Sequence, residues 1–274
     1  MPPNDQIKQE PLLKRLYVFT GKGGVGKSSL ALSLAHHLAR TKKRVLYLTF
    51  NQPDNRRHCE ELGIPFRQLQ EEDSAQKYMA HKLNSELIAS WIGGSHFFQS
   101  IYKMIPGLSH LIFMGHLLSI LEEDPQLTIV LDSPSSGHTK VLFESSHNFK
   151  RIFRTGVIVD DIENMHCQLR TNDFLKIIVV TTPSLMAIQE GEELVSFLSS
   201  LKLPLPGQLV INNLLSRTIA DPPQLHPYLK SKIAQERDVL SRVDLTTTIL
   251  FPHRPTLINS ELVEELSPTT EVLL

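Results

Sequence analysis

Residues 19–35 read FTGKGGVGKSSLALSLA, and this stretch decides the fold. Residues 21–28 match the pattern Gly-x-x-x-x-Gly-Lys-Ser, in which glycines let backbone N–H groups face phosphate oxygens and the lysine reaches the terminal phosphates. An apolar run at residues 15–20 precedes the pattern, and apolar side chains at four-residue steps follow it, so the loop joins a strand to a helix. This context predicts a nucleotide-phosphate site.

The loop carries two lysines with different expected roles. Lys27 is placed to reach the terminal phosphates, and the Ser28 hydroxyl is placed to bind Mg²⁺. Lys22 follows the first glycine, and extra positive charge there could stabilise phosphoryl transfer in its own site or in that of a partner molecule. The residues expected at the phosphates are Gly21, Lys22, Gly23, Gly24, Val25, Gly26, Lys27, Ser28 and Ser29.

Strand and helix patterns alternate along the chain. The strand candidates are residues 15–20, 44–50, 127–132, 175–182, 208–213 and 246–251. Their near-continuous apolar character is typical of strands covered on both faces. The pattern predicts an α/β P-loop NTPase fold with a doubly wound, mostly parallel sheet. Residues 74–124 show no strand pattern, and we expect a helical insertion over one edge or mouth of the sheet, within a single domain spanning residues 1–274.

Composition excludes several classes of protein. Hydrophobic residues make up 41% of the 274 residues and charged ones 21%, as in ordinary globular proteins, and a net charge of −1 gives no general attraction to nucleic acid or anionic lipid. Cys59 and Cys167 form no paired motif, which favours a reducing compartment. Residues 1–15 lack the apolar core of a signal peptide, and no apolar run reaches the roughly 20 residues of a membrane span. We therefore expect a cytoplasmic protein with no nucleic-acid partner and no direct membrane insertion.

Residues 21–29, GKGGVGKSS, resemble the deviant Walker A loop of the ATPases that include MinD, ParA, nitrogenase iron proteins and the arsenical-pump ATPase (ArsA) family. In that group the second lysine acts across a dimer that encloses the nucleotides. The resemblance implies ATP and Mg²⁺ as ligands, a role in trans for Lys22, and a homodimer or a heterodimer with a family member.

Residues 128–143, TIVLDSPSSGHTKVLF, narrow the resemblance to the ArsA family, which includes the tail-anchored-protein targeting ATPases. They are similar to that family's switch, Asp-Thr-Ala-Pro-Thr-Gly-His-Thr, which implies a segment that moves between nucleotide states. Asp132 also ends a predicted strand, where a carboxylate can hold Mg²⁺ through water. For His138, the alternative is a histidine that simply packs in a turn. The residues taken as matches are Asp132, Pro134, Gly137, His138 and Thr139, with Pro134 one position before the family's proline.

Later segments extend the resemblance over residues 16–266. Residues 179–198 resemble the family's strand, Thr-x-Pro and helix element, with Glu190 included. Asn212 matches the asparagine that recognises adenine, and a side-chain amide can pair with the adenine edge. Pro252 matches the proline before the loop that wraps the base.

One departure leaves two functions open. Asn51 stands where the family has the aspartate that positions the attacking water, and an amide can orient water but cannot accept a proton. Asp54, three residues later, is a second candidate for that role. The chain is thus expected to be either an ATP-hydrolysing switch or a non-hydrolysing, ATP-binding regulatory or scaffold subunit of an active family member.

The helical insertion offers a possible contact surface. Its apolar residues could line a groove for a hydrophobic client helix, or they could pack on the sheet. Those residues are Met79, Leu83, Leu87, Ile88, Trp91, Phe97 and Phe98.

Overall fold

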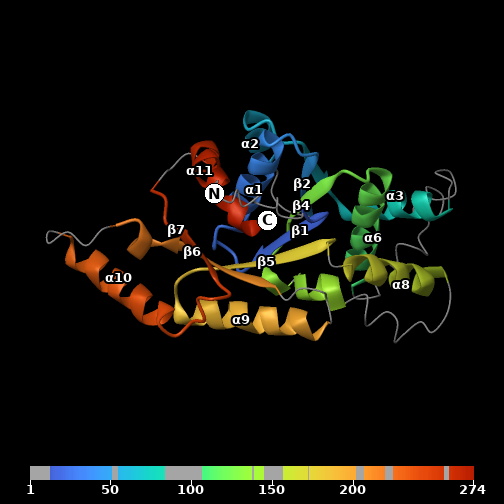
Figure 1. Ribbon diagram of the computed structural model, residues 1–274. Coiled ribbons are helices and arrows are strands. Elements are labelled where there is room, and N and C mark those ends of the chain that lie inside the picture. Colours follow the sequence, from blue (N-terminus) through green and yellow to red (C-terminus); the bar gives the residue numbers. More distant parts are fainter. Residues whose placement is uncertain are drawn as a thin grey trace, which may run out of the picture.

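A computed structural model describes residues 13–50, 55–83, 107–137, 139–144, 157–171, 173–201, 207–219, 225–255 and 259–274. Its centre is a seven-stranded sheet in the order β3-β2-β4-β1-β5-β6-β7 (Figure 1). Every paired strand is parallel to its neighbour. The prediction of a P-loop type α/β fold with a doubly wound, parallel sheet is therefore confirmed.

The strands and helices follow one another in near-regular alternation. The strands are β1 (Leu16–Gly21), β2 (Val45–Phe50), β3 (Phe66–Leu69), β4 (Thr128–Asp132), β5 (Leu175–Thr181), β6 (Gln208–Leu214) and β7 (Ile249–Pro252). The helices are α1 (Lys27–Arg40), α2 (Arg56–Glu61), α3 (Glu71–Leu83), α6 (Leu108–Glu123), α8 (Val157–Leu169), α9 (Leu185–Ser200), α10 (Pro227–Leu240) and α11 (Asn259–Leu266). The described residues also form the 3-10 segments η1 (Leu215–Arg217) and η2 (Ser267–Leu273).

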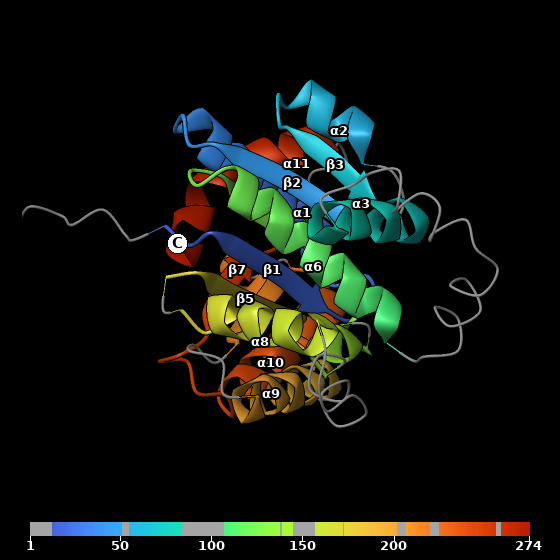
Figure 2. The same ribbon diagram turned by 90° about the vertical axis from the view of Figure 1, so that its right-hand side faces the viewer.

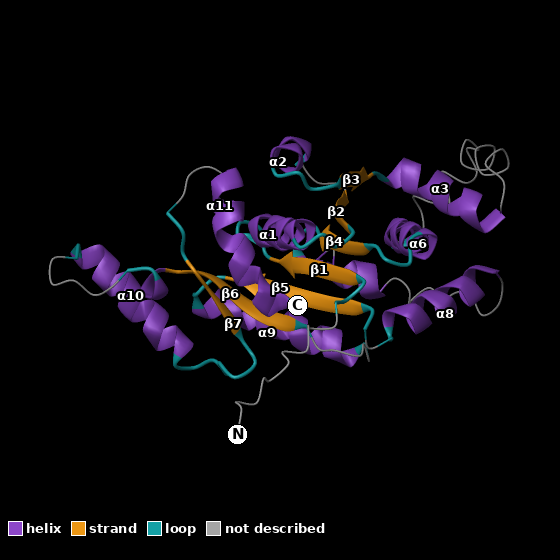
Figure 3. Ribbon diagram, turned by 45° about the horizontal axis from the view of Figure 1, so that its top comes forward, coloured by secondary structure: helices purple, strands orange, loops and turns teal. Residues whose placement is uncertain are grey.

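The sheet separates two hydrophobic layers. One face of the central strands packs against α6, α8 and α9, and the other packs against α1, α11 and η2. Figures 2 and 3 show these helices on opposite sides of the strands, with α10 lying beyond the β6 and β7 side of the sheet. Because the strands are parallel, their carboxyl ends meet along one edge, where ligand sites of such sheets form.

Six of the strands lie where the sequence predicts them, and one was missed. The four residues of β3, FRQL, include two polar side chains, and this short edge strand has no continuous apolar run. Strand β7 begins at Ile249, three residues later than expected, because residues 244–248 form a turn held by Asp244 and Thr246.

Helices α3 and α6 fall in the predicted helical insertion. Helix α6 is apolar around most of its circumference, which is typical of a helix covered on several sides. Phe113 stacks on Phe50 of β2 with ring centroids 4.0 Å apart, so α6 lies on the face of the sheet rather than over its edge. None of the helices in the described ranges is long and apolar enough to cross a membrane.

Arg15 ties the start of β1 to the end of α6. Its guanidinium donates to the carbonyl oxygens of Leu121 at 2.6 Å, Asp124 at 2.8 Å and Leu127 at 2.9 Å. The last carbonyls of a helix have no partner within the helix, and a cation there also meets the negative end of the helix dipole. Arg15 thus fixes the turn that leads into β4 and, through β4, into the site.

We expect Arg15→Met to lower the free energy of unfolding by about 2–3 kcal/mol, because three charge-assisted hydrogen bonds are lost. Arg44→Met is the matched control, since Arg44 pairs with Asp124 in the same turn but its side chain is 64% exposed. An exposed ion pair contributes about 1 kcal/mol or less. Urea unfolding of both variants tests this, and equal losses would contradict the assigned role of Arg15.

Candidate functional site

The predicted phosphate loop connects β1 to α1 at the carboxyl edge of the sheet. Strand β1 ends at Gly21, and Gly26 caps the start of α1 in the left-handed conformation, with φ of 91°. A Cβ atom on Gly26 would lie 2.3 Å from the Asn212 amide nitrogen, and one on Gly21 would lie 2.1 Å from the carbonyl oxygen of Val180. Both positions therefore require glycine, and buried Val25 fastens the loop to the core.

Lys27 folds back over the loop. Its ammonium group donates to the backbone carbonyl of Lys22 at 2.9 Å. Partial burial lowers the pKa of this amine, and the nearby Asp132 carboxylate opposes the shift. The Lys27 ammonium group therefore lies over the phosphate loop, which leads directly into helix α1.

Ser28 and Asp132 meet at the centre of the site. The Ser28 hydroxyl donates to Asp132 Oδ2 at 2.6 Å, and the Tyr47 phenol donates to the same oxygen at 2.9 Å. Asp132 is fully buried, and this burial raises the pKa of its carboxyl group. The two hydroxyl donors and the charge of Lys27 act in the opposite direction.

The Ser28 and Asp132 oxygens fit Mg²⁺. This ion prefers oxygen ligands and is commonly held by one or two protein groups together with substrate phosphates. The described residues contain no cluster of three or more His, Cys, Asp or Glu side chains suited to a metal ion. A hydroxyl and a carboxylate beside a phosphate loop match the magnesium pattern rather than a metal site built from protein ligands alone.

The second lysine of the loop pairs with the helix after β5. Lys22 Nζ lies 2.9 Å from Glu190 Oε1 on α9, and the two side chains are 62% and 46% exposed. Both residues were singled out in the sequence, but their pairing was not predicted. An ion pair this exposed adds little to stability, so it can exchange with other partners.

Buried hydroxyl groups connect the predicted switch to β1. Thr20 in β1 donates to the Thr139 hydroxyl at 2.7 Å, and the Thr139 hydroxyl lies 2.8 Å from that of Ser133. These hydrogen bonds join the segment after β4 to β1, the strand that leads into the phosphate loop. Pro134 is half-buried and Gly137 is exposed, while His138 lies outside the described residues.

The adenine candidate Asn212 contacts the phosphate loop. It is buried on β6, and its amide nitrogen donates to the carbonyl oxygen of Val25 at 3.0 Å. The amide group has two N–H donors, and this bond uses one of them. Pro252 ends β7 in register with Leu214, near the end of β6. Asn51 and Asp54 both lie outside the described residues. Of the seven apolar residues singled out in the insertion, only Met79 and Leu83 lie within the described ranges.

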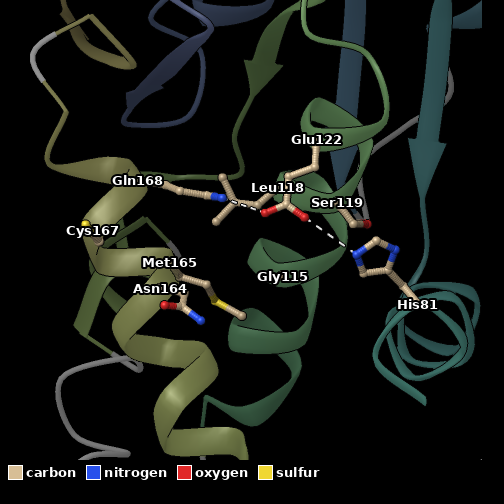
Figure 4. A pocket seen from close by; sticks show the side chains of 9 residues that line it. All are labelled: His81, Gly115, Leu118, Ser119, Glu122, Asn164, Met165, Cys167 and Gln168. Carbon is tan, nitrogen blue, oxygen red and sulfur yellow. Dashed lines mark hydrogen bonds and ion pairs between the residues drawn. The ribbon is translucent and has the colours of Figure 1, made fainter. Parts of the chain in front are cut away.

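A separate pocket of about 330 Å³ lies between α3, α6 and α8 (Figure 4). Leu118 and Met165 contribute apolar surface, and Glu122 contacts both His81 and Gln168 at the rim. Met79 of α3 is partly buried and packs against the hydrophobic core, in agreement with the packing alternative.

Comparison with known families agrees with this geometry. A model described as the CobQ/CobB/MinD/ParA nucleotide binding domain matches residues 16–215. The chain belongs to the CobQ/CobB/MinD/ParA family. No curated protein matches the sequence at a significant level. The family match begins with β1 and ends just after β6, so it includes the phosphate loop, Asp132 and Asn212. The protein is thus a P-loop nucleotide-binding protein.

Tyr47, which lies near the site of this family member, was not predicted from the sequence. Tyr47 lies inside the apolar run VLYLTF, where it reads as an ordinary buried strand residue. The only available signal was chemical, because a buried phenol usually needs a hydrogen-bond partner. No local pattern in the sequence identifies Asp132 as that partner.

We expect Gly26→Ala to lower the free energy of unfolding by about 1–3 kcal/mol, because Ala is strained at positive φ and its Cβ displaces Asn212. Gly23→Ala is the control, since a Cβ there has no neighbour within 4 Å and its φ is not positive. Chemical denaturation without nucleotide measures both. A Gly26→Ala protein as stable as Gly23→Ala would show that the loop does not depend on this close approach.

Proposed function

We propose that the protein is an ArsA-type, Mg-ATP-dependent switch that dimerises around its nucleotides. The observation that carries the proposal is the 2.6 Å contact between Ser28 Oγ and Asp132 Oδ2 at the mouth of the phosphate loop. The contact brings together two oxygen groups that suit a nucleotide-bound Mg²⁺, the Ser28 hydroxyl from α1 and the Asp132 carboxylate from β4. Membership of a nucleotide-binding family supports the nucleotide-binding part of this proposal.

Each part of the site has a distinct proposed role. Loop N–H groups and the Lys27 ammonium bind the phosphates, and the N-terminus of α1 adds its partial positive charge. Ser28 and Asp132 hold Mg²⁺, which when bound neutralises charge on the phosphate oxygens. The second amide proton of Asn212 pairs with adenine, and Pro252 leads the chain over the base.

Lys22 is proposed to act on the nucleotide of a dimer partner. Its pairing with Glu190 keeps it on its own subunit, and that exposed pair must break before the lysine reaches across. The cost is about 1 kcal/mol or less, which phosphate contacts in a dimer can exceed. The partner is a second copy or another family member.

The switch after Asp132 is proposed to carry the nucleotide signal outward. Thr139 connects it to β1, and α6 and α8 lie on the same face of the sheet. A hydrophobic client helix near the insertion is the proposed recipient, and the pocket between α3, α6 and α8 supports this location.

The second candidate is a non-hydrolysing subunit that binds ATP to hold its conformation. It is favoured by Asn51, which stands where the resembling family has a water-positioning aspartate. In that case the chain would pair with an active family member, and binding without turnover would be its normal behaviour.

We expect Lys27→Ala to weaken ATP binding roughly 10- to 150-fold, the loss of one charge-assisted contact worth about 1.5–3 kcal/mol. Lys22→Ala should keep the wild-type affinity of the monomer but lose ATP-dependent dimerisation and any turnover. Titration calorimetry measures the affinity, and light scattering with and without nucleotide measures the mass.

Each lysine variant serves as the control for the other, since both remove one ammonium group from the same loop. Wild-type dimerisation and turnover in Lys22→Ala would contradict the role in trans. Unchanged ATP affinity in Lys27→Ala would contradict the phosphate site itself.

Restoring the carboxylate tests hydrolysis. We expect Asn51→Asp to raise steady-state phosphate release by about 100-fold, in the range that a positioned acid–base group contributes. No increase, together with loss of wild-type turnover in Asp54→Asn, would instead identify Asp54 as the working carboxylate. No turnover in any variant would favour the regulatory subunit.

A further inference from the structure

Tyr47 is a fully buried tyrosine whose hydroxyl reaches the proposed magnesium site. It donates to Asp132 Oδ2 at 2.9 Å, the same oxygen that accepts the Ser28 hydroxyl at 2.6 Å. Asp132 is therefore held from two sides, by α1 through Ser28 and by β2 through Tyr47. Neither the phosphate-loop pattern nor the switch pattern includes this tyrosine.

The sheet register explains how Tyr47 reaches the carboxylate. Tyr47 on β2 and Tyr17 on β1 both pair with Val130 of β4, and both side chains lie in the layer facing α1. Their hydroxyls have different partners. The Tyr47 hydroxyl contacts Asp132, two residues further along β4, whereas the Tyr17 hydroxyl accepts from the backbone nitrogen of Lys14, before β1 begins.

The Tyr47 ring is fixed by its other neighbours. It stacks on Phe66 of β3 with centroids 6.1 Å apart, and the Arg56 guanidinium lies over the same Phe66 ring. The Asn55 amide nitrogen lies 3.3 Å from the phenol oxygen, as a donor. Asn55 precedes α2 and directly follows residues 51–54, where the water-positioning residue is expected.

We infer that Tyr47 is a positioning residue for Mg²⁺, holding the Asp132 carboxylate in the orientation in which it receives the ion. The inference rests on the proposed Mg-ATP function and adds a residue to its metal site. Groups that hydrogen-bond to metal ligands orient them, and their loss commonly weakens metal binding about 10- to 100-fold.

The chemistry of the phenol suits this task. A phenol is neutral near pH 7, so the Tyr47 hydroxyl is a hydrogen-bond donor to the carboxylate. A buried carboxylate is costly to keep charged without such donors. The Asn55 contact also joins the start of α2 to the metal site, so residues on both sides of the expected water-positioning segment are tied to Asp132.

The test compares Tyr47→Phe with Tyr17→Phe. Both variants remove one hydroxyl from a fully buried tyrosine in the same layer, but only Tyr47 contacts Asp132. Mn²⁺ serves as the probe, and electron paramagnetic resonance measures its Kd in the presence of saturating ATPγS. Calorimetry in EDTA measures the affinity for ATPγS without metal.

We expect Tyr47→Phe to raise the Mn²⁺ Kd about 10-fold while the nucleotide affinity in EDTA changes less than about twofold. Tyr17→Phe should change neither value. A purely structural role would reduce both affinities together. In an Asp132→Asn background, Tyr47→Phe should have no further effect on the Mn²⁺ Kd, because the phenol acts through that carboxylate.

Three results would overturn the inference: an unchanged Mn²⁺ Kd in Tyr47→Phe, an equal change in Tyr17→Phe, or a full effect that persists with Asp132→Asn. If Tyr47→Phe does not fold, Asn55→Ala replaces it, with an expected rise of about threefold through the weakened phenol. An unchanged value there would equally contradict the role. A wild-type protein without metal-dependent nucleotide binding would overturn the proposed function as well.

Discussion

The hydrogen bond from Ser28 to Asp132 is the contact on which the site depends. It spans 104 residues of sequence and joins the start of α1 to the end of β4. It forms because β1 and β4 are parallel neighbours with Phe19 in register with Asp132, so the two strands reach the same edge together. Lys27, Tyr47 and the switch hydroxyls are all arranged around this junction, so the phosphate loop, Asp132 and the segment after β4 form one connected unit.

Much of this arrangement follows from local sequence patterns. The glycine spacing of residues 21–26 is required by backbone conformations that the structure contains, with positive φ at Gly24 and Gly26. Apolar runs located six strands because strands covered on both faces leave few polar positions to obscure the pattern. Asp132 could be assigned to the site because a carboxylate at the carboxyl end of a parallel strand meets the loop that follows a neighbouring strand.

The contacts that could not be predicted from the sequence depend on side-chain length and on strand register. Tyr47 meets Asp132 only because Thr49 pairs with Asp132 across β2 and β4, which places Tyr47 two residues back on the same layer. Lys22 meets Glu190 across the gap between the loop and α9. Strand β3 was missed because FRQL is short and half polar. The roles of Asn51 and Asp54 stay predictions, since both lie outside the described residues.

The Ser28–Asp132 junction is proposed to be a magnesium-nucleotide site. Titration calorimetry of the wild-type protein with ATPγS, once with Mg²⁺ and once with EDTA, tests it most directly. We expect one nucleotide per chain and an affinity at least about tenfold higher with Mg²⁺, since the ion adds contacts of roughly 1.4 kcal/mol or more. Absence of binding, or an affinity that does not depend on Mg²⁺, would contradict it.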